Sequence, residues 1–203
     1  MSGISQIADS IIAVDSIIAA AGKLPDPSGS AQKPFVIAID GPCASGKSTL
    51  ARQLQLRLGC PVIKMDHFFL PAELRTPSRL AQEGGNIHYE RFEAEVLNGL
   101  VTGQQFNYRI FDCSSMTYSN TITVLSSPIV IIEGSYSLHP KWRSQIDLAI
   151  FLRAGKEDQE QRILERSSLD VLKDFQHKWI PLENRYFSKF KICESADMVF
   201  ISD

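Results

Sequence analysis

The fold of this chain is decided by residues 35–48, which read FVIAIDGPCASGKS. Residues 35–39 are a short run that is apolar on both faces, which is typical of a central strand in a parallel sheet. Residues 48–58 place three leucines at helical spacing and predict a helix. Between them, residues 41–48 match the pattern G-x-x-x-x-G-K-[ST] in full. The stretch therefore predicts a strand, a phosphate-binding loop and a helix in direct succession.

The residue types of this loop suit the binding of a nucleoside triphosphate with Mg²⁺. The glycines allow a backbone turn that points successive N–H groups at a β-phosphate, and the start of the helix adds partial positive charge there. Lys47 is expected to reach the β- and γ-phosphates, and the Ser48 hydroxyl is expected to ligate Mg²⁺. The predicted nucleotide-binding residues are Gly41, Ala44, Ser45, Gly46, Lys47, Ser48 and Thr49.

The rest of the chain alternates between strand and helix patterns. Further parallel strands are predicted at 61–65, 129–132, 148–152 and 198–201. Helices are predicted at 89–100 and over most of 156–190, and residues 70–88 read as a long polar loop. Residues 106–111 and 121–125 alternate in polarity, which predicts an antiparallel pair beside the main sheet. Together these patterns predict a doubly wound α/β domain.

The amino-terminal part predicts an amphipathic helix over 1–22, a turn-rich linker over 23–33, and a nucleotide-binding domain over 34–203. A signal peptide would begin with basic residues, but no Lys or Arg precedes Lys23. The apolar run in 4–18 is interrupted by aspartates and is too short to span a bilayer. An interfacial helix would carry Lys or Arg on its polar face. We expect a helix packed on the domain of a soluble, cytoplasmic protein without a membrane partner.

Composition argues against several other kinds of partner. With 203 residues and 44% hydrophobic content the chain can build one full-sized core, and its formal net charge of -2 gives no electrostatic case for nucleic acid. The 4 cysteines form no C-x-x-C pair, so we expect reduced thiols. The 4 histidines never fall at ligand spacing, so no metal site built by the protein alone is indicated.

The ends of two predicted strands narrow the class of reaction. The strand at 61–65 closes on Asp66, and the strand at 129–132 ends in Glu133 and a glycine, a single carboxylate aimed at the Mg²⁺ region. Motor and transport ATPases usually carry Asp-Glu at that place, and the chain has no N-K-x-D guanine reader of GTPases. Small-molecule and nucleotide kinases remain. Nucleoside monophosphate kinases commonly read G-K-G-T, whereas residues 46–49 read GKST, which favours the nucleoside kinase side.

Several segments resemble the uridine kinase-like family, which includes phosphoribulokinase-type enzymes, and most closely its compact bacterial-type branch. The segments are IAIDGP at 37–42, KMDHFFL at 64–70, NIHYERF at 86–92, IEGSY at 132–136 and WIPLE at 179–183. The resemblance runs from about residue 35 to the end. It implies a three-layer P-loop NTPase fold with a five-stranded parallel sheet ordered 2-3-1-4-5, a small antiparallel insertion and a helical lid. It also implies ATP rather than GTP as the phosphate donor.

Beside Lys47, the resemblance implies catalytic roles for Asp66, Arg162 and Arg166 and a role at the metal for Glu133. Asp66 would accept or orient the hydroxyl proton of the acceptor and help to hold Mg²⁺, although such an aspartate can also simply cap the next loop. Arg162 and Arg166 match the lid arginines, which offset charge on the transferred phosphate, although neighbouring acidic residues could hold them as surface ion pairs. Glu133 would order Mg²⁺-bound water or cap a helix.

The acceptor side departs from the family pattern. His88 stands where uridine kinases carry an aspartate for the ribose hydroxyls, His67 replaces a second aspartate of the closer branch, and Cys113 replaces a histidine that contacts the base. The candidate acceptor contacts are His88, Tyr108, Arg109 and Asp112. An arginine cluster that could grip a second phosphate consists of Arg75, Arg79 and Arg91. Each of these residues can equally be structural.

The sequence thus predicts transfer of the γ-phosphate of Mg-ATP to a hydroxyl group of a small-molecule acceptor, with a nucleoside as the leading candidate. Another acceptor, such as a vitamin precursor, a sugar acid or a monophosphate, is the alternative within the same class. A module that binds ATP without transferring phosphate is the alternative from another class, suggested by His67 and His88. Whether the chain forms a homo-oligomer is left open.

Overall fold

The computed structural model describes residues 13–20, 22 and 33–202. Residues 13–20 are helical, and Ala13, Val14 and Ile17 are buried in a hydrophobic core that they share with side chains of the central sheet. The remainder of the predicted amino-terminal helix and most of the predicted linker, residues 1–12, 21 and 23–32, lie outside the described residues.

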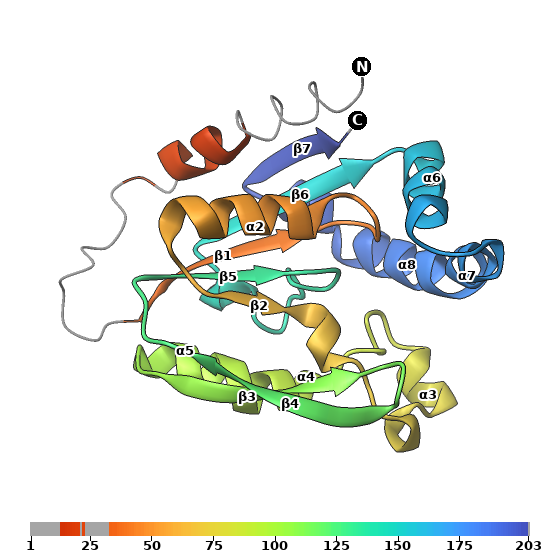
Figure 1. The fold of residues 1–203 in the computed structure, drawn as a ribbon, viewed down its shortest axis with the longest axis horizontal. Helices are drawn as coiled ribbons and strands as arrows, with labels where there is room; N and C mark the ends of the chain where they lie inside the picture. Colours follow the sequence, from red (N-terminus) through yellow and green to blue (C-terminus); the bar gives the residue numbers. More distant parts are fainter. Residues whose placement is uncertain (1–12, 21, 23–32, 203) are drawn as a thin grey trace.

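A five-stranded sheet forms the centre of the molecule (Figure 1). From one edge to the other its strands are β2 (Val62–Lys64), β5 (Ile129–Glu133), β1 (Phe35–Asp40), β6 (Leu148–Ala154) and β7 (Met198–Ser202). Every neighbouring pair is parallel. Counted along the chain this is the order 2-3-1-4-5, so the predicted parallel α/β sheet and its strand order are confirmed.

Strand β1 lies at the centre because its side chains are buried on both faces. Ile37 and Ile39 pack with Leu50 and Leu54 of helix α2 (Lys47–Leu58), on the face that also receives the helix at residues 13–20. The alternate residues of β1 contribute to the core on the other face. Since side chains alternate along a strand, one apolar run supplies two cores and makes a three-layer domain.

The chain after β6 supplies several helices, the first two of which lie beyond the carboxyl end of β6 (Figure 1). They are α6 (Lys156–Arg166), α7 (Leu169–Asp174), the π-helical turn η5 (Phe175–Trp179), α8 (Ile180–Phe190) and α9 (Ile192–Ser195). Tyr186 of α8 is fully buried in the core of the second face. The short 3₁₀ turn η4 (Arg143–Gln145) precedes β6.

The segment between β2 and β5 forms the second unit beside the sheet, as predicted for an antiparallel insertion. Its hairpin consists of β3 (Phe106–Asp112) and β4 (Thr117–Val124), so β4 begins four residues earlier than the expected 121. The helix before it runs through α4 (Tyr89–Phe92), the π-helical turn η3 (Glu93–Leu97) and α5 (Asn98–Thr102). The expected loop over 70–88 contains two short helices, η2 (Ala72–Leu74) and α3 (Pro77–Leu80).

Within the described part of the chain, no helix has the length and apolar character needed to cross a membrane.

Candidate active site

The loop between β1 and α2 adopts backbone angles that few residue types tolerate. Gly41 has φ 146°, Ala44 has φ 58° and Gly46 has φ 90°. A side chain at Gly41 would also collide with the carbonyl oxygen of Leu152 in the neighbouring strand. The two glycines are therefore required by the shape of the loop.

Helix α2 begins with groups suited to an anion. Its N-cap is Gly46, which offers no side-chain cap, and its first turn carries no acidic residue. The first N–H groups of a helix have no partner inside the helix, so at this end they remain available to a ligand. A phosphate group fits this combination of free amides and helix dipole.

Lys47 points back across the loop. Its Nζ donates hydrogen bonds to the carbonyl oxygens of Gly41 at 2.9 Å and Pro42 at 2.7 Å, and the side chain is largely buried. The ammonium group is thus held over the loop by weakly competing carbonyl partners. It can exchange them for phosphate oxygens, which are stronger acceptors because they are charged.

A hydroxyl and two carboxylates gather at the ends of β2 and β5. The hydroxyl of Ser48 donates to Glu133, whose two carboxylate oxygens both lie at 3.2 Å. Lys64 at the end of β2 is in register with Glu133, and Asp66 follows it in the 3₁₀ turn η1 (Met65–Phe68), where it is exposed. The pKa of Glu133 is raised by burial and then by the negative charge of Asp66.

This donor set suits Mg²⁺ bound together with phosphate oxygens. Mg²⁺ prefers oxygen ligands and is usually held by one or two carboxylates plus substrate phosphates. Ser48, Glu133 and Asp66 supply such oxygens beside the loop. Among the described residues, no group of three His, Cys, Asp or Glu side chains is arranged to hold a metal ion by itself.

Asp40 connects the phosphate-binding loop to two other parts of the fold, a role that the sequence reasoning missed. Its carboxylate accepts hydrogen bonds from the N–H of Gly41 at 2.7 Å, Tyr136 at 3.1 Å and Leu138 at 3.0 Å, and from the hydroxyl of Tyr186 at 2.8 Å. Burial raises its pKa to about 6, against the lowering effect of these donors. Its place at the end of an apolar strand was the only signal in the sequence.

Glu183 of α8 was also missed and holds the loop from the opposite side. Its carboxylate accepts from the N–H of Cys43 at 2.8 Å and from the hydroxyl of Ser135 at 2.7 Å, and that hydroxyl also lies 3.0 Å from the Gly41 carbonyl oxygen. The side chain is buried, which raises its pKa. An acidic residue on the buried face of an amphipathic helix was the available signal.

Helix α6 reaches the loop through Gln159 and Arg162. The amide of Gln159 donates to the Cys43 carbonyl oxygen at 2.9 Å, and Arg162 donates to that of Ala44 at 3.3 Å. Arg166 lies exposed at the end of the same helix. Of the two predicted lid arginines, the structure brings Arg162 to the loop.

The predicted acceptor contacts are divided between the site and the local structure. The hydroxyl of Tyr108 lies 3.2 Å from Nδ1 of His67, next to Asp66. His88 instead caps α4, because its Nδ1 accepts from the N–H of Arg91 at 3.2 Å. Arg109 pairs with Glu95, and Asp112 accepts from Ser114 in the hairpin turn.

Two members of the predicted arginine cluster are engaged in the fold. Arg79 pairs with Glu90 at 2.9 Å and donates to the carbonyl oxygens of Gly85 and Ile87. Arg91 is buried, pairs with Glu95 at 3.2 Å and donates to the carbonyl oxygens of Arg109 and His67. Arg75 differs from both, because it lies on the wall of a cavity.

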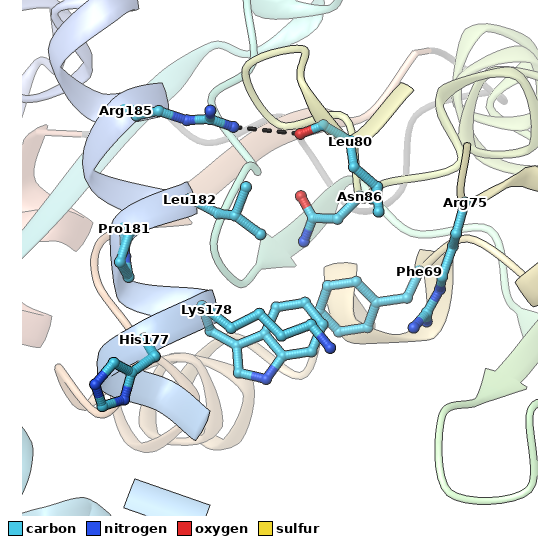
Figure 2. A pocket seen from close by; sticks show the side chains of 10 residues that line it. Phe69, Arg75, Leu80, Asn86, His177, Lys178, Pro181, Leu182 and Arg185 are labelled. Atoms are coloured by element: carbon cyan, nitrogen blue, oxygen red, sulfur yellow. Dashed lines mark hydrogen bonds between the residues drawn. The ribbon is translucent and has the colours of Figure 1, made fainter. Parts of the chain in front are cut away.

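This cavity of about 330 Å³ opens between the segment after η1 and helix α8 (Figure 2). Its apolar wall consists of Phe69, Leu80, Trp179, Pro181 and Leu182. Its polar wall consists of Arg75, Asn86, His177, Lys178 and Arg185. Apart from Arg75, none of these residues was a predicted site residue, because they come from segments distant in sequence.

Comparisons with known proteins find similarity to several kinases. A shikimate kinase family model matches residues 43–175. A pantothenate kinase from Streptomyces avermitilis is 30% identical over 159 residues, which are 66% of this chain and 47% of that protein. The chain therefore spans about half the length of this curated relative.

Solved structures share the fold over nearly the whole chain. A possible uridine kinase from Bacillus stearothermophilus has a TM-score of 0.68 at 20% identity and covers 97% of this chain and 99% of that one. A D-glycerate 3-kinase from Cryptococcus neoformans has a TM-score of 0.61 at 15% identity, with 90% and 87% covered. At such identities the structures establish the common fold alone.

Proposed function

The chain belongs to the P-loop kinase family, as the match of residues 43–175 to the shikimate kinase model shows, and we propose that it transfers the γ-phosphate of ATP to a hydroxyl group of a small acceptor. One observation carries the proposal. Lys47, the Ser48–Glu133 pair and Asp66 meet at the carboxyl ends of adjacent parallel strands, the edge where α/β folds bind ligands.

The phosphate-binding loop would hold the triphosphate. The free N–H groups at the start of α2 would receive the β-phosphate, and Lys47 would move from the carbonyl oxygens of Gly41 and Pro42 to the β- and γ-phosphates. Gly41, Ala44, Ser45, Gly46 and Thr49 would shape this cradle around it.

Ser48, Glu133 and Asp66 would hold Mg²⁺, which when bound neutralises charge on the phosphate oxygens. Burial alone disfavours the charged form of Glu133, and Asp66 adds to that effect, so the two carboxylates favour a cation between them. The Ser48 hydroxyl already faces Glu133 and supplies the third oxygen.

Asp66 would also act on the acceptor. It is exposed beside the phosphate-binding site, so its carboxylate can orient the attacking hydroxyl and accept its proton. Arg162, which already contacts the loop, would offset charge that develops during transfer, with Arg166 joining it from the same helix.

The resemblance to uridine kinases supports a nucleoside as the first acceptor class to test. The relative named pantothenate kinase supports other small hydroxyl compounds equally well. The chain retains Lys47, Ser48, Asp66 and Glu133 together, which favours a kinase over a module that only binds ATP. The four free cysteines support a reducing compartment and hence a cytoplasmic location.

The test is Mg-ATP-dependent ADP production with nucleosides, other small alcohols, hydroxy acids and monophosphates as acceptors. We expect one class to stimulate ADP release, and we expect Asp66→Asn to reduce kcat by at least about a hundredfold while ATP affinity stays within about twofold. ATP binding without acceptor-dependent ADP release across the panel would contradict the proposal, and unchanged turnover in Asp66→Asn would remove Asp66 from the reaction.

A further inference from the structure

The cavity beside α8 gathers positive charge without any negative charge to balance it. Arg75, Lys178 and Arg185 line it, and no Asp or Glu is among the described residues of its wall. None of these three cations has a carboxylate partner within the described part of the chain, whereas Arg79, Arg91 and Arg109 are all paired with Glu90 or Glu95. Cations that the fold does not neutralise are suited to an anionic ligand.

The hydrogen bonds that these cations make leave donors available. Arg185 donates one hydrogen bond from its Nη2 to the Leu80 carbonyl oxygen, 3.2 Å away (Figure 2). Arg75 donates its Nε to the Leu70 carbonyl oxygen at 2.7 Å, and its Nη2 lies 3.9 Å from Sγ of Cys113. The ammonium of Lys178 lies 4.7 Å from the centre of the Trp179 ring. A guanidinium group has five N–H donors, so both arginines retain donors for a carboxylate or a phosphate.

Asn86 gives the cavity a buried polar group that lacks a hydrogen-bond partner. Its side chain is 6% exposed, lines the cavity, and its Oδ1 has no hydrogen-bond partner. Figure 2 shows it between Arg185 at one end of the cavity and Lys178 at the other. A buried amide oxygen without a partner is costly, and a ligand that donates a hydrogen bond removes that cost.

The remaining wall suits an apolar or ring-shaped body. The rings of Phe69 and Trp179 lie 6.3 Å apart at 38° to each other, and Leu182 completes this surface. A ligand that fits here therefore combines an apolar body, a hydrogen-bond donor such as a hydroxyl, and an anionic group.

Residues of the cavity wall adjoin residues of the phosphate-transfer site along the chain. Leu182 is adjacent to Glu183, which binds the N–H of Cys43 in the phosphate-binding loop. Phe69 directly follows η1, the turn that carries Asp66. Asn86 also interacts with Tyr136, in the segment after Glu133, in a way that lowers the pKa of the Tyr136 hydroxyl against the larger raising effect of burial.

We infer that this cavity binds the phosphate acceptor, and that the acceptor is a small hydroxyl compound that also carries a carboxylate or phosphate group. The inference rests on the proposed function. It places an anionic acceptor ahead of a nucleoside, because a neutral nucleoside would leave the three cations without a partner. Arg75, Lys178 and Arg185 would bind the anionic group, and Asn86 a hydroxyl or N–H of the same molecule.

The first experiment measures binding without turnover. The phosphate-binding loop is filled with Mg²⁺ and a non-hydrolysable ATP analogue, and benzoate, phenyl phosphate and neutral benzamide are titrated by calorimetry. We expect at least one anion to bind about tenfold more tightly than benzamide, and the better anion distinguishes a carboxylate from a phosphate site. Equal affinity for all three probes would overturn the inference.

The variants Lys178→Gln and Arg185→Gln should each weaken binding of the better anion by about tenfold. Arg185→Lys, which keeps the charge, should retain most of the affinity. The matched control is Lys189→Gln, because Lys189 is exposed on the same helix and does not line the cavity. Anion affinities within twofold of the unchanged protein in both Gln variants would contradict the site.

The second experiment separates this inference from the proposed function. ADP production is compared for shikimate and its neutral methyl ester, and for ribose 5-phosphate and ribose. If the anionic member of each pair is the better acceptor, and Arg185→Gln raises its KM, both the proposed function and the anion site are supported. Phosphorylation of neutral acceptors only would leave the kinase in place and overturn the anion site. Anion binding without any phosphorylation would contradict the proposed function, and with it the assignment of the anion as a phosphate acceptor, while leaving the anion site itself in place.

Discussion

The carboxylate of Glu183 accepts a hydrogen bond from the backbone N–H of Cys43 at 2.8 Å, although 140 residues separate them. This bond fastens helix α8 to the phosphate-binding loop. The Ser135 hydroxyl, which binds both Glu183 and the Gly41 carbonyl oxygen, adds the segment after β5 to the same contact. The shape of the loop thus depends on residues from three parts of the chain.

Glu183→Leu should therefore weaken ATP binding, because the partly buried N–H of Cys43 loses its acceptor and the loop loses a contact that holds it in place. We expect a rise in the Kd for ATP of about tenfold and a loss of about 1–3 kcal/mol in unfolding free energy. Glu183→Gln keeps one oxygen acceptor and should restore most of the ATP affinity. Asn184→Leu, at the exposed neighbour, is the control. If Glu183→Leu lowers stability but leaves ATP affinity unchanged, Glu183 does not position the loop.

Glu133→Gln should raise the Mg²⁺ concentration that gives half-maximal activity by about tenfold, since a neutral amide is a weaker ligand than a carboxylate. The wild-type pKa of Glu133 is raised by burial and by Asp66, so its affinity for Mg²⁺ should also fall as the pH falls toward that pKa. The exposed Glu194→Gln serves as control. A Mg²⁺ titration that is unchanged in Glu133→Gln would exclude this residue as a ligand.

Tyr186→Phe should destabilise the fold more at pH 8 than at pH 5. Burial raises the pKa of Asp40 from its usual 3.8 to about 6, so the stability that protonation gives is present below pH 3.8 and is lost as the pH rises through about 6. Without the Tyr186 hydroxyl, the charged form of Asp40 has one donor fewer. We expect Tyr186→Phe to lower the unfolding free energy by about 1–2 kcal/mol at pH 8 and by less at pH 5.

Urea unfolding of Tyr186→Phe at both pH values measures this difference. Tyr118→Phe is the matched control, because Tyr118 lies 40% exposed on β4. A destabilisation that is the same at both pH values would show that the hydroxyl of Tyr186 acts independently of the charge on Asp40.

His139 should limit stability in acid. Its ring is stacked on that of Tyr186 at 5.8 Å and lies 5.1 Å from that of Trp142, and burial lowers its pKa from 6.5 to about 4. A lowered histidine pKa means that the unfolded chain binds more protons, so stability present above pH 6.5 is lost as the pH falls from 6.5 to about 4. His139→Gln should be less stable at pH 7 but should lose less on acidification, whereas the exposed His177→Gln should follow the wild type. Parallel pH profiles for wild type and His139→Gln would contradict this.

Much of the architecture could be predicted because it is encoded locally. The apolar run of β1, the loop motif and the leucines of α2 lie within 24 consecutive residues, Phe35 to Leu58, and each has its own pattern. The carboxylates at Asp66 and Glu133 followed from the rule that parallel strands end at one edge. The strand order required the family resemblance, because spacing along the chain does not determine which strands are neighbours.

The acceptor side could not be predicted in the same way, because the same residue types serve structure and binding. His88 reads as a ligand contact, yet its ring caps α4. The pair of Arg91 and Glu95 is visible at helical spacing and could have removed Arg91 from the phosphate-binding candidates. The cavity joins residues such as Arg75 and Arg185, which local patterns cannot bring together.

The surroundings of Cys43 make its thiol a reporter of opening of the phosphate-binding loop. Burial and the nearby Glu183 raise the pKa of its thiol to about 12, so at neutral pH almost no reactive thiolate is present while the loop is closed against α6 and α8. The rate of alkylation of Cys43 therefore depends on how often these contacts open. Nucleotides or acceptors that tighten the loop would slow that rate, and the exposed Cys113 provides an internal standard for reagent access in the same molecule.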